Sequence, residues 1–375
     1  MTMTKALDNA SVFSHGYIES NAARWERERR IPREAFVQAA AAGLCGLLVP
    51  EDCGGAGLSV SELTGVAEAL AYSDMGFAFA LVPHNNLASA IARQGSEEAR
   101  SQYLPSMLDG TNIGAFLLTE PGAGTDASAI STTAVRCDEG WILNGAKAWI
   151  TNATNADILR VYARTDENAG SREILDFLVR ADQPGVIREA PYEMLGGYAT
   201  GTGGFRFENV ILTEDQLFSP PGTAYRAAMD AIALARVLVA ALCVGILRRG
   251  VDVGVDYMKS RKAFGQRLAD NQGLRWMLAD VATDLEATAA LVDRAARLID
   301  QNSDEALVAT AHAKKFSARA ATRGLEQCMQ VLGANGLRQD LPIARHFAAA
   351  KMAHYLDGTT EVQNLVISRA LFDES

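Results

Sequence analysis

Cysteine is scarce in this sequence, and its spacing excludes the protein classes that depend on it. Five of the 375 residues are cysteine, an odd number, and no two of them form a C-x-x-C pair. This distribution is typical of reduced thiols and argues against a disulfide framework or a structural zinc site. The five histidines are scattered too, without an H-E-x-x-H spacing, so we expect no bound metal. The cysteines are Cys45, Cys53, Cys137, Cys243 and Cys328.

Positive charge and long apolar runs are lacking as well. The chain has 35 Lys and Arg against 45 Asp and Glu, a formal net charge of −10. Such an acidic protein is a poor partner for nucleic acid or an anionic membrane surface. The longest apolar run, residues 237–247, falls short of the roughly 20 residues that span a bilayer, and the polar N-terminus lacks the apolar core of a signal peptide. We therefore expect a soluble, cytoplasmic protein.

The apolar residues that are present divide the chain into three blocks. In residues 1–110 they recur at helical spacing, and Ser59 and Ser61 are candidate N-caps after a glycine-rich turn. Residues 111–218 form short β-branched runs separated by Gly, Asn and Asp, which indicates an antiparallel barrel or sandwich. Residues 219–375 return to long helical stretches with short links.

These blocks predict an α+β multidomain fold. The expected domains are an N-terminal α-helical domain (1–110), a middle antiparallel β-barrel domain (111–218) and a C-terminal antiparallel four-helix bundle (219–375). A G-x-G-x-x-G motif after a strand is absent, so nothing supports a Rossmann fold. The expected strands are 131–137, 140–151, 157–165, 173–181 and 203–212, and the expected long helices are 224–259, 271–301, 304–332 and 342–353, with a final helix after Thr359.

Two neighbouring segments of the middle block are candidates for ligand contact. In LLTEPGAGTDAS (117–128), Gly122 and Gly124 let the backbone approach a flat or phosphorylated ligand, although an ordinary surface turn is as common for such a loop. In GWILNGAKAWITNA (140–153), Asn144-Gly145 is a hairpin signal. Trp149 near the end of that segment suits either the barrel core or a ligand face.

Together with further segments, these two resemble the acyl-CoA dehydrogenase family of flavoenzymes. The resemblance covers nearly the whole chain, because six segments occur in the family's order. They are LLVPEDCGGAGLS, LLTEPGAGTDAS, NGAKAWITN, RKAFGQRLADNQGLRWMLAD, QVLGANG and LDGTTEVQNLVISRA. The resemblance implies the three-domain fold and a bound FAD between the β domain and the bundle.

The resemblance also assigns cofactor contacts. Thr119 would bond the flavin pyrimidine edge, Trp149 would cover a ring face, and Thr151 would bond N5, the atom that receives hydride. A second group would hold the diphosphate and adenosine end, partly from a neighbouring subunit, which implies a homo-oligomer, in this family usually a dimer of dimers. The remaining contacts near the flavin would be Phe116, Leu118, Gly124, Thr125, Thr359 and Glu361, and the second group would be Arg261, Phe264, Gln272, Gln330 and Gly333.

Asp357 stands where most members of the family carry a catalytic glutamate before Gly-Thr. The resemblance therefore implies that Asp357 removes the α-proton of an acyl thioester while the β-hydride goes to flavin N5. Its reach is one methylene shorter, about 1.5 Å. The substrate contacts implied with it are Thr125, Arg236, Leu356 and Gly358.

Several departures from the family pattern suggest a specialised member. Ala235 stands where some relatives place an alternative base, and Ala233 where many have an aspartate that contacts pantetheine. Ala348 and Ala349 replace a usual Arg-Asp pair, and Ala334 replaces the second glycine of a Gly-Gly. We expect a short or polar acyl group on CoA or on an acyl-carrier protein, with an electron-transfer flavoprotein as acceptor.

Two other interpretations remain open. The first is another chemistry on the same fold, either a flavin-dependent oxidase of the nitroalkane-oxidase type or another kind, or a non-redox elimination. Nitroalkane oxidase resembles this family and has an aspartate at the same place. The second is a non-catalytic FAD-binding protein. His84, outside these motifs, is expected to be a core histidine whose ring nitrogens bond the backbone.

Overall fold

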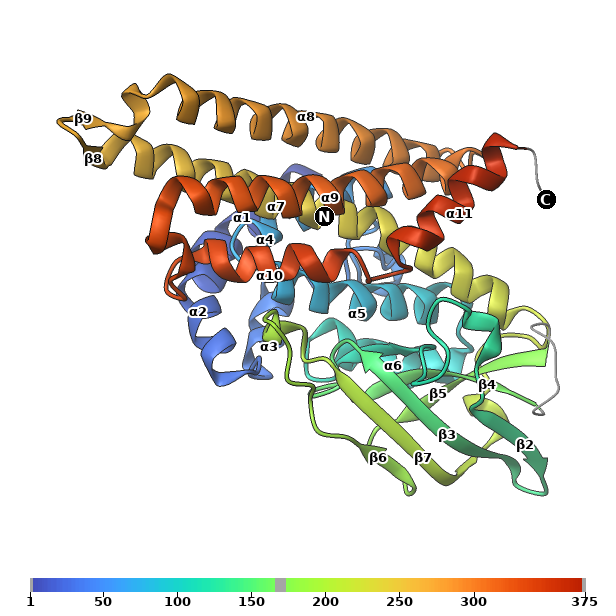
Figure 1. Ribbon diagram of the computed structural model, residues 1–375. Helices are drawn as coiled ribbons and strands as arrows, with labels where there is room; N and C mark the ends of the chain where they lie inside the picture. Colours follow the sequence, from blue (N-terminus) through green and yellow to red (C-terminus); the bar gives the residue numbers. More distant parts are fainter. Residues whose placement is uncertain (1–2, 166–172, 373–375) are drawn as a thin grey trace.

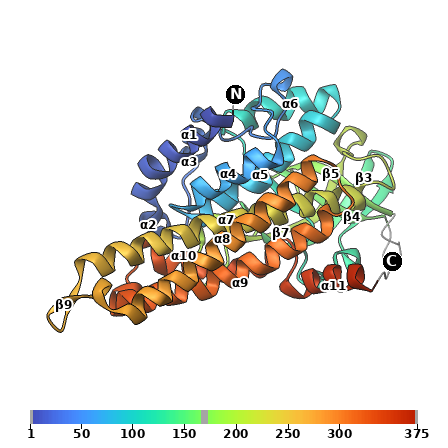
Figure 2. The ribbon, with the colours of Figure 1, turned by 90° about the horizontal axis from the view of Figure 1, so that it is seen from above.

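The computed structural model describes residues 3–165 and 173–372 and has three regions in the order helices, sheet, helices (Figure 1). Helix α5 (Met75–Gln94) lies between the sheet and the C-terminal helices, since it packs on both β1 (Gly114–Leu117) and α7 (Ala224–Ser260). Seen from above, α7 runs alongside α8 (Gln272–Asp300) and α9 (Ala306–Leu332), with the N-terminal helices against one side (Figure 2). This arrangement confirms the expected fold class.

The N-terminal region is built from α-helices whose starts are capped by side chains. Ser59 caps α4 in a reciprocal capping box with Glu62, as expected. Ser61 is not a cap, because its hydroxyl donates to Asp300 of α8. Asp74 caps α5, so α4 and α5 are two separate helices. The helices are α1 (Met3–Phe13), α2 (Glu19–Glu28), α3 (Glu34–Ala41), α4 (Val60–Ala71), α5 (Met75–Gln94) and α6 (Glu97–Leu108), with the π-helix Ser14–Ile18 between α1 and α2.

The middle region is one curled seven-stranded sheet in the order β1-β4-β2-β3-β7-β6, with β5 also paired to β4. All five runs expected as strands are present, as β2 to β5 and β7, and β1 and β6 are additional. Most pairs are antiparallel, but β1 and β2 both run parallel to β4. The strands are β1 (Gly114–Leu117), β2 (Thr133–Cys137), β3 (Gly140–Ile150), β4 (Ile158–Arg164), β5 (Ile174–Arg180), β6 (Val186–Arg188) and β7 (Gly203–Leu212).

The expected hairpin at Asn144-Gly145 is wrong. Strand β3 runs through both residues, and the register against β7 shifts between Leu143 and Gly145, so the pair forms a bulge. Gly145 has φ +141°, and a Cβ there would lie 2.6 Å from the Thr132 hydroxyl. The asparagine–glycine signal therefore marks a backbone irregularity inside a strand.

The C-terminal region is a helical bundle whose central helix is α7. By length and composition this helix could cross a membrane, but 72% of its most apolar window is buried inside the protein, which marks it as a core helix. One hydrophobic cluster joins α4 and α5 to α7, α8, α9 and α10. The elements are α7 (Ala224–Ser260), β8 (Lys262–Ala263), β9 (Gln266–Arg267), α8 (Gln272–Asp300), α9 (Ala306–Leu332), α10 (Pro342–Ala353) and α11 (Thr360–Leu371). The domain limits at 110/111 and 218/219 stay a prediction.

Candidate active site

Asp357 lies in a tight turn that joins α10 to α11. Its φ is +50°, a left-handed conformation that aspartate tolerates better than most residues, and Gly358 follows with φ +95°. A Cβ at Gly358 would lie 3.3 Å from Arg236 Nη2 and 3.2 Å from Gln363 Nε2, so the turn needs glycine on two grounds. Thr359 then caps α11 with its side chain.

Two buried cations hold the backbone of this turn. Arg236 of α7 donates from Nε to the carbonyl oxygen of Asp357 at 3.0 Å. Lys314 of α9 donates from Nζ to the carbonyl oxygens of Gly358 at 2.6 Å and His354 at 3.2 Å. Both cations therefore fix the main chain on either side of the acid, and neither hydrogen-bonds to its carboxylate.

The Asp357 carboxylate is left free as a result. The residue is partly exposed, but its Oδ2 is buried and has no hydrogen-bond partner among the described residues. Burial raises the pKa of Asp357 to about 6, against the opposing effects of Lys314 and Arg236. A carboxylate with such a pKa is mostly ionised at neutral pH yet far more basic than an ordinary aspartate, as a general base requires.

The glycine-rich loop is tied to β3 by a buried ion pair. Glu120 Oε1 lies 2.7 Å from Lys147 Nζ, which also donates to the carbonyl oxygen of Leu118 at 3.0 Å. The Glu120 carboxylate also accepts hydrogen bonds from the backbone N–H groups of Ser131 and Thr132 and from the Ser131 hydroxyl. Both charged side chains are almost fully buried, and the pair holds the residues before the loop against the end of β3.

The residues expected to line the flavin lie on these two segments. Trp149 has φ +59° and an exposed ring that contacts Tyr192 at 4.6 Å between ring centroids. Thr119 and Thr151 are partly exposed, and neither hydroxyl is hydrogen-bonded to another residue of the described chain. Asn152 anchors the end of this strand, because its side-chain amide donates to carbonyl oxygens of α5 and β1.

The remaining residues of this first group differ in exposure. Phe116 packs against Tyr162, and the side chain of Leu118 is buried in a cluster with the first turns of α7. Gly124 and Thr125 are exposed, and a Cβ at Gly124 would meet nothing within 4 Å. The same cluster includes Ala228, two turns before Arg236, so the loop and the Asp357 turn lie about 12 Å apart along α7.

The second group of expected FAD contacts lies elsewhere on the same chain. Arg261 is 25 residues beyond Arg236 on continuous helix, which is about 37 Å. The β8–β9 hairpin and the α9–α10 connection lie together at that end of the bundle, opposite α11 (Figure 1). All five residues there are exposed: Arg261, Phe264, Gln272, Gln330 and Gly333. One flavin dinucleotide does not span this distance, so within one chain the two groups do not form one site.

Two further expected contacts lie beside the acid. Leu356 is partly buried and packs on the bundle core. Glu361 is in the first turn of α11, where hydrogen bonds from its own backbone and from Thr359 lower its pKa. The roles assigned to both residues, like those of the other site residues, stay predictions.

The residues present fit FAD near Asp357. A flavin needs hydrogen-bond partners, a stacking surface and room for close approach. The site offers unpartnered threonine hydroxyls, an exposed tryptophan ring and free space next to the glycines of the loop. The sequence motifs contained Glu120 and Lys147 but did not reveal their pairing. Nothing in the sequence singled out Lys314, Gln363 or Asn152.

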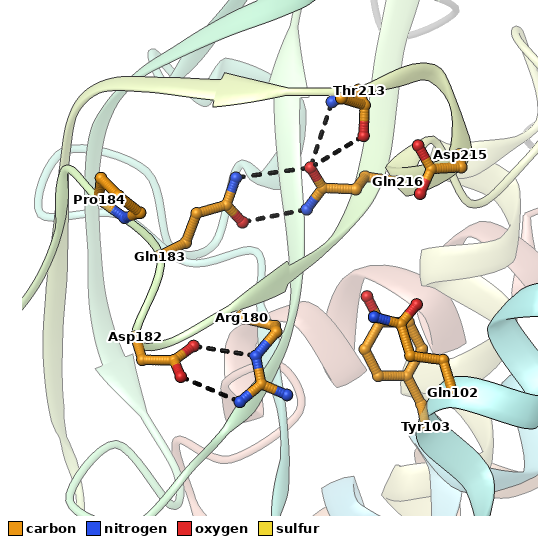
Figure 3. A pocket seen from close by; sticks show the side chains of 9 residues that line it. All are labelled: Gln102, Tyr103, Arg180, Asp182, Gln183, Pro184, Thr213, Asp215 and Gln216. Carbon is orange, nitrogen blue, oxygen red and sulfur yellow. Dashed lines mark hydrogen bonds and ion pairs between the residues drawn. The ribbon is translucent and has the colours of Figure 1, made fainter.

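A polar hollow of about 420 Å³ lies away from this site, between α6 and the ends of β5 and β7 (Figure 3). Arg180 in it is held by both oxygens of Asp182, and the amides of Gln183 and Gln216 pair with each other. None of the expected site residues lines it. His84 is also outside the site: it is fully buried, and its ring nitrogens bond the backbone of Met107 and Gly114, as expected.

Comparison with known proteins accounts for this architecture. The N-terminal, middle and C-terminal domain models of acyl-CoA dehydrogenase match residues 4–111, 115–210 and 225–372. The mitochondrial short-chain specific acyl-CoA dehydrogenase of Sus scrofa is 33% identical over 348 residues, which cover 92% of this chain and 84% of that protein.

Two solved structures are similar over almost their whole length. Butyryl-CoA dehydrogenase from Megasphaera elsdenii has a TM-score of 0.94 at 31% identity, with 99% of each chain covered. The prolyl acyl carrier protein oxidase AnaB has a TM-score of 0.92 at 25% identity, with 98% of each covered. The resemblance inferred from six sequence segments is therefore confirmed, and with it FAD as cofactor and oxidoreduction of CH–CH bonds: the chain belongs to the acyl-CoA dehydrogenase family.

Proposed function

We propose that this protein catalyses the FAD-dependent α,β-dehydrogenation of a short or polar acyl thioester, with Asp357 as the base. The observation that carries the proposal is the buried Oδ2 of Asp357, which has no partner in the described chain although two cations lie close by. A buried carboxylate is normally paired, so a free one at a cofactor site is a candidate for chemistry.

The reaction removes a proton from the α-carbon and a hydride from the β-carbon, and it leaves a double bond conjugated with the thioester carbonyl. FAD, when bound, supplies the hydride acceptor. The Asp357 carboxylate takes the α-proton. The backbone N–H of Gly358 has no acceptor among the described residues, and in this proposal it binds the thioester carbonyl, which acidifies that proton.

The substrate is proposed to be carried either by CoA or by an acyl-carrier protein. Similarity to a short-chain acyl-CoA dehydrogenase favours a short acyl group. Similarity to a prolyl acyl carrier protein oxidase favours a polar group on a carrier protein. Ala233, at the place of the family's usual pantetheine-contacting aspartate, is compatible with the second carrier.

We further propose that the protein works as a homo-oligomer, a dimer of dimers. The five exposed residues at the far end of the bundle are about 37 Å of helix away from Arg236, so they would meet a flavin only on a neighbouring subunit. Phe264, fully exposed at the hairpin tip with φ +49°, supports this arrangement.

The proposed electron acceptor is an electron-transfer flavoprotein. The alternative is an oxidase that passes its electrons to oxygen, and the similarity to AnaB is the observation that favours it. The two are told apart after substrate reduction. Fast reoxidation by oxygen with peroxide release marks the oxidase, and slow reoxidation by oxygen with fast transfer to an electron-transfer flavoprotein marks the dehydrogenase.

Anaerobic mixing of the FAD-loaded protein with short-chain acyl-CoA and acyl-carrier-protein substrates tests the proposal. At least one substrate should bleach the flavin. Asp357→Asn should bind FAD and lower the bleaching rate at least a thousandfold, while Asp280→Asn, an exposed control on α8, should match the wild type. Bleaching by Asp357→Asn at the wild-type rate would remove Asp357 as the base.

A further inference from the structure

Lys314 is a buried lysine that takes no part in the proposed proton and hydride transfers. Its side chain is fully buried on α9, and it forms no ion pair with any carboxylate of the described residues. Lysine is almost never fully buried unless its charge is compensated. Here the compensation comes from backbone carbonyls.

The carbonyls that Lys314 binds flank the Asp357 turn. The shorter bond, 2.6 Å, is to Gly358 directly after the acid, and the longer, 3.2 Å, is to His354, the C-cap of α10. Carbonyl groups at a helix C-terminus carry partial negative charge and lack partners in their own helix. One ammonium group thus caps α10 and closes the turn at both ends.

We propose that Lys314 is a positioning residue for the base. It holds residues 354–358 so that the Asp357 carboxylate hydrogen-bonds to neither cation, and its charge sets the electrostatic environment of that carboxylate. This inference rests on the proposed role of Asp357, and it adds a residue that touches neither substrate nor flavin.

The charges around the turn agree with this role. Lys314 on α9 and Arg236 on α7 both lower the pKa of Asp357, against the larger effect of burial. The other titratable groups that face the ammonium are Cys243 of α7 and Glu361 of α11, and His354 lies close to it. Lys314 is thus the one cation that binds the carbonyls on both sides of Asp357 within the described chain.

Two substitutions separate the effect of the Lys314 charge from the effect of its hydrogen bonds to the turn. Lys314→Gln keeps an N–H donor but loses the charge, and Lys314→Met loses both. Lys315→Met is the matched control, because Lys315 is the next residue on α9 and is partly exposed. All three are compared as FAD-loaded proteins with the substrate that bleaches the wild type.

The pH dependence of the bleaching rate reports the charge. Without the Lys314 charge the pKa of Asp357 rises, so the acid limb should shift upward by about one pH unit in both Lys314 variants. At the pH plateau, Lys314→Gln should lose about tenfold and Lys314→Met about a hundredfold, because the turn is held less well. An acid limb in Lys314→Gln that coincides with the wild type overturns the electrostatic part.

Hydrogen exchange of the peptide 354–363 reports the holding of the turn without using activity. Its amides should exchange at least tenfold faster in Lys314→Met than in Lys315→Met. Equal exchange in these two variants overturns the positioning role. If Lys314→Met fails to bind FAD, hydrogen exchange in Lys314→Gln tests the positioning role, and the pH profile of Lys314→Gln tests the electrostatic role.

Failure of this inference is distinguishable from failure of the proposed function. If Asp357→Asn bleaches like the wild type, the base assignment fails and Lys314 has nothing to position. If Asp357→Asn loses bleaching while both Lys314 variants behave like Lys315→Met, the base stands and the role of Lys314 is refuted.

Discussion

The protein buries an acid and a lysine close together twice, once beneath the glycine-rich loop and once beside the α10–α11 turn. Burial lowers the pKa of both lysines, Lys147 and Lys314, to about 8, so both are cationic at neutral pH. Glu120 hydrogen-bonds to its lysine directly, whereas Asp357 does not, because Lys314 binds the backbone instead.

The two acids consequently differ in proton affinity. Burial alone would raise the pKa of Glu120, but Lys147 and hydrogen bonds from Thr132 and Ser131 lower it to about 2. At Asp357 the effect of burial exceeds the opposing effects of Lys314 and Arg236, and the pKa is raised to about 6. Whether the lysine donates to the carboxylate or to the main chain therefore separates an acid with a low pKa from one whose pKa lies near neutrality, as the proposed role of Asp357 requires.

Breaking the Glu120 pair should have the largest effect on stability. Lys147→Met leaves a buried carboxylate without its cation, and the expected loss is about 3–5 kcal/mol in the free energy of unfolding. Urea unfolding of the FAD-loaded protein measures it, with exposed Lys262→Met as the control. Adding Glu120→Gln to Lys147→Met should recover part of the loss, and a double variant no better than the single one would contradict the ion-pair explanation.

The comparison also shows what the sequence could and could not reveal. Long helices and five of the strands follow from local periodicity and turn residues, so they were predicted, whereas the short β1 and β6 were not. The family was recognised because its motifs are contiguous segments. The Asn144-Gly145 bulge was misassigned because the pairing of β3 with β7, not the local dipeptide, decides the backbone there.

The side chain of Lys314 was missed for a similar reason. Its partners lie 40 and 44 residues away, and they are backbone carbonyls that carry no residue identity. Asp357 was proposed as the base from its motif, but the lack of a hydrogen-bond partner at its carboxylate depends on where Lys314 and Arg236 direct their donors. Only the tertiary structure contains that information.

Removing the charge of Asp357 should stabilise the protein. Its pKa of about 6 in the folded state lies above the roughly 3.9 of an unfolded aspartate, so the free energy of unfolding falls as the pH rises from about 4 to about 6. The penalty is complete above about pH 6 and disappears below about pH 3, where both states are protonated. Asp357→Asn should therefore gain at most about 3 kcal/mol in unfolding free energy at pH 8 and little near pH 4.

Urea unfolding at the two pH values measures this difference, with Asp280→Asn as the control. A gain of equal size at pH 4 and pH 8 would mean that it does not come from the buried charge. Loss of stability at pH 8 would show that the carboxylate has a partner and resembles Glu120 after all.

The length of the side chain at residue 357 should also affect the rate. Asp357→Glu keeps a carboxylate between the same two cations but extends it by about 1.5 Å. If the substrate is bound to suit the shorter acid, the longer one is misplaced, and the bleaching rate should fall about a hundredfold. The φ of +50° adds a smaller cost, because aspartate adopts it more readily than glutamate.

The matched control is Glu120→Asp at the other acid. Shortening Glu120 should weaken its ion pair with Lys147, but it should not shift the low-pH side of the pH profile of the bleaching rate. If Asp357→Glu instead bleaches faster than the wild type, the shorter base is not adapted to its substrate. Any acid at this position would then have a free carboxylate. The presence of aspartate would be explained by the backbone of the turn, which requires a left-handed residue before Gly358.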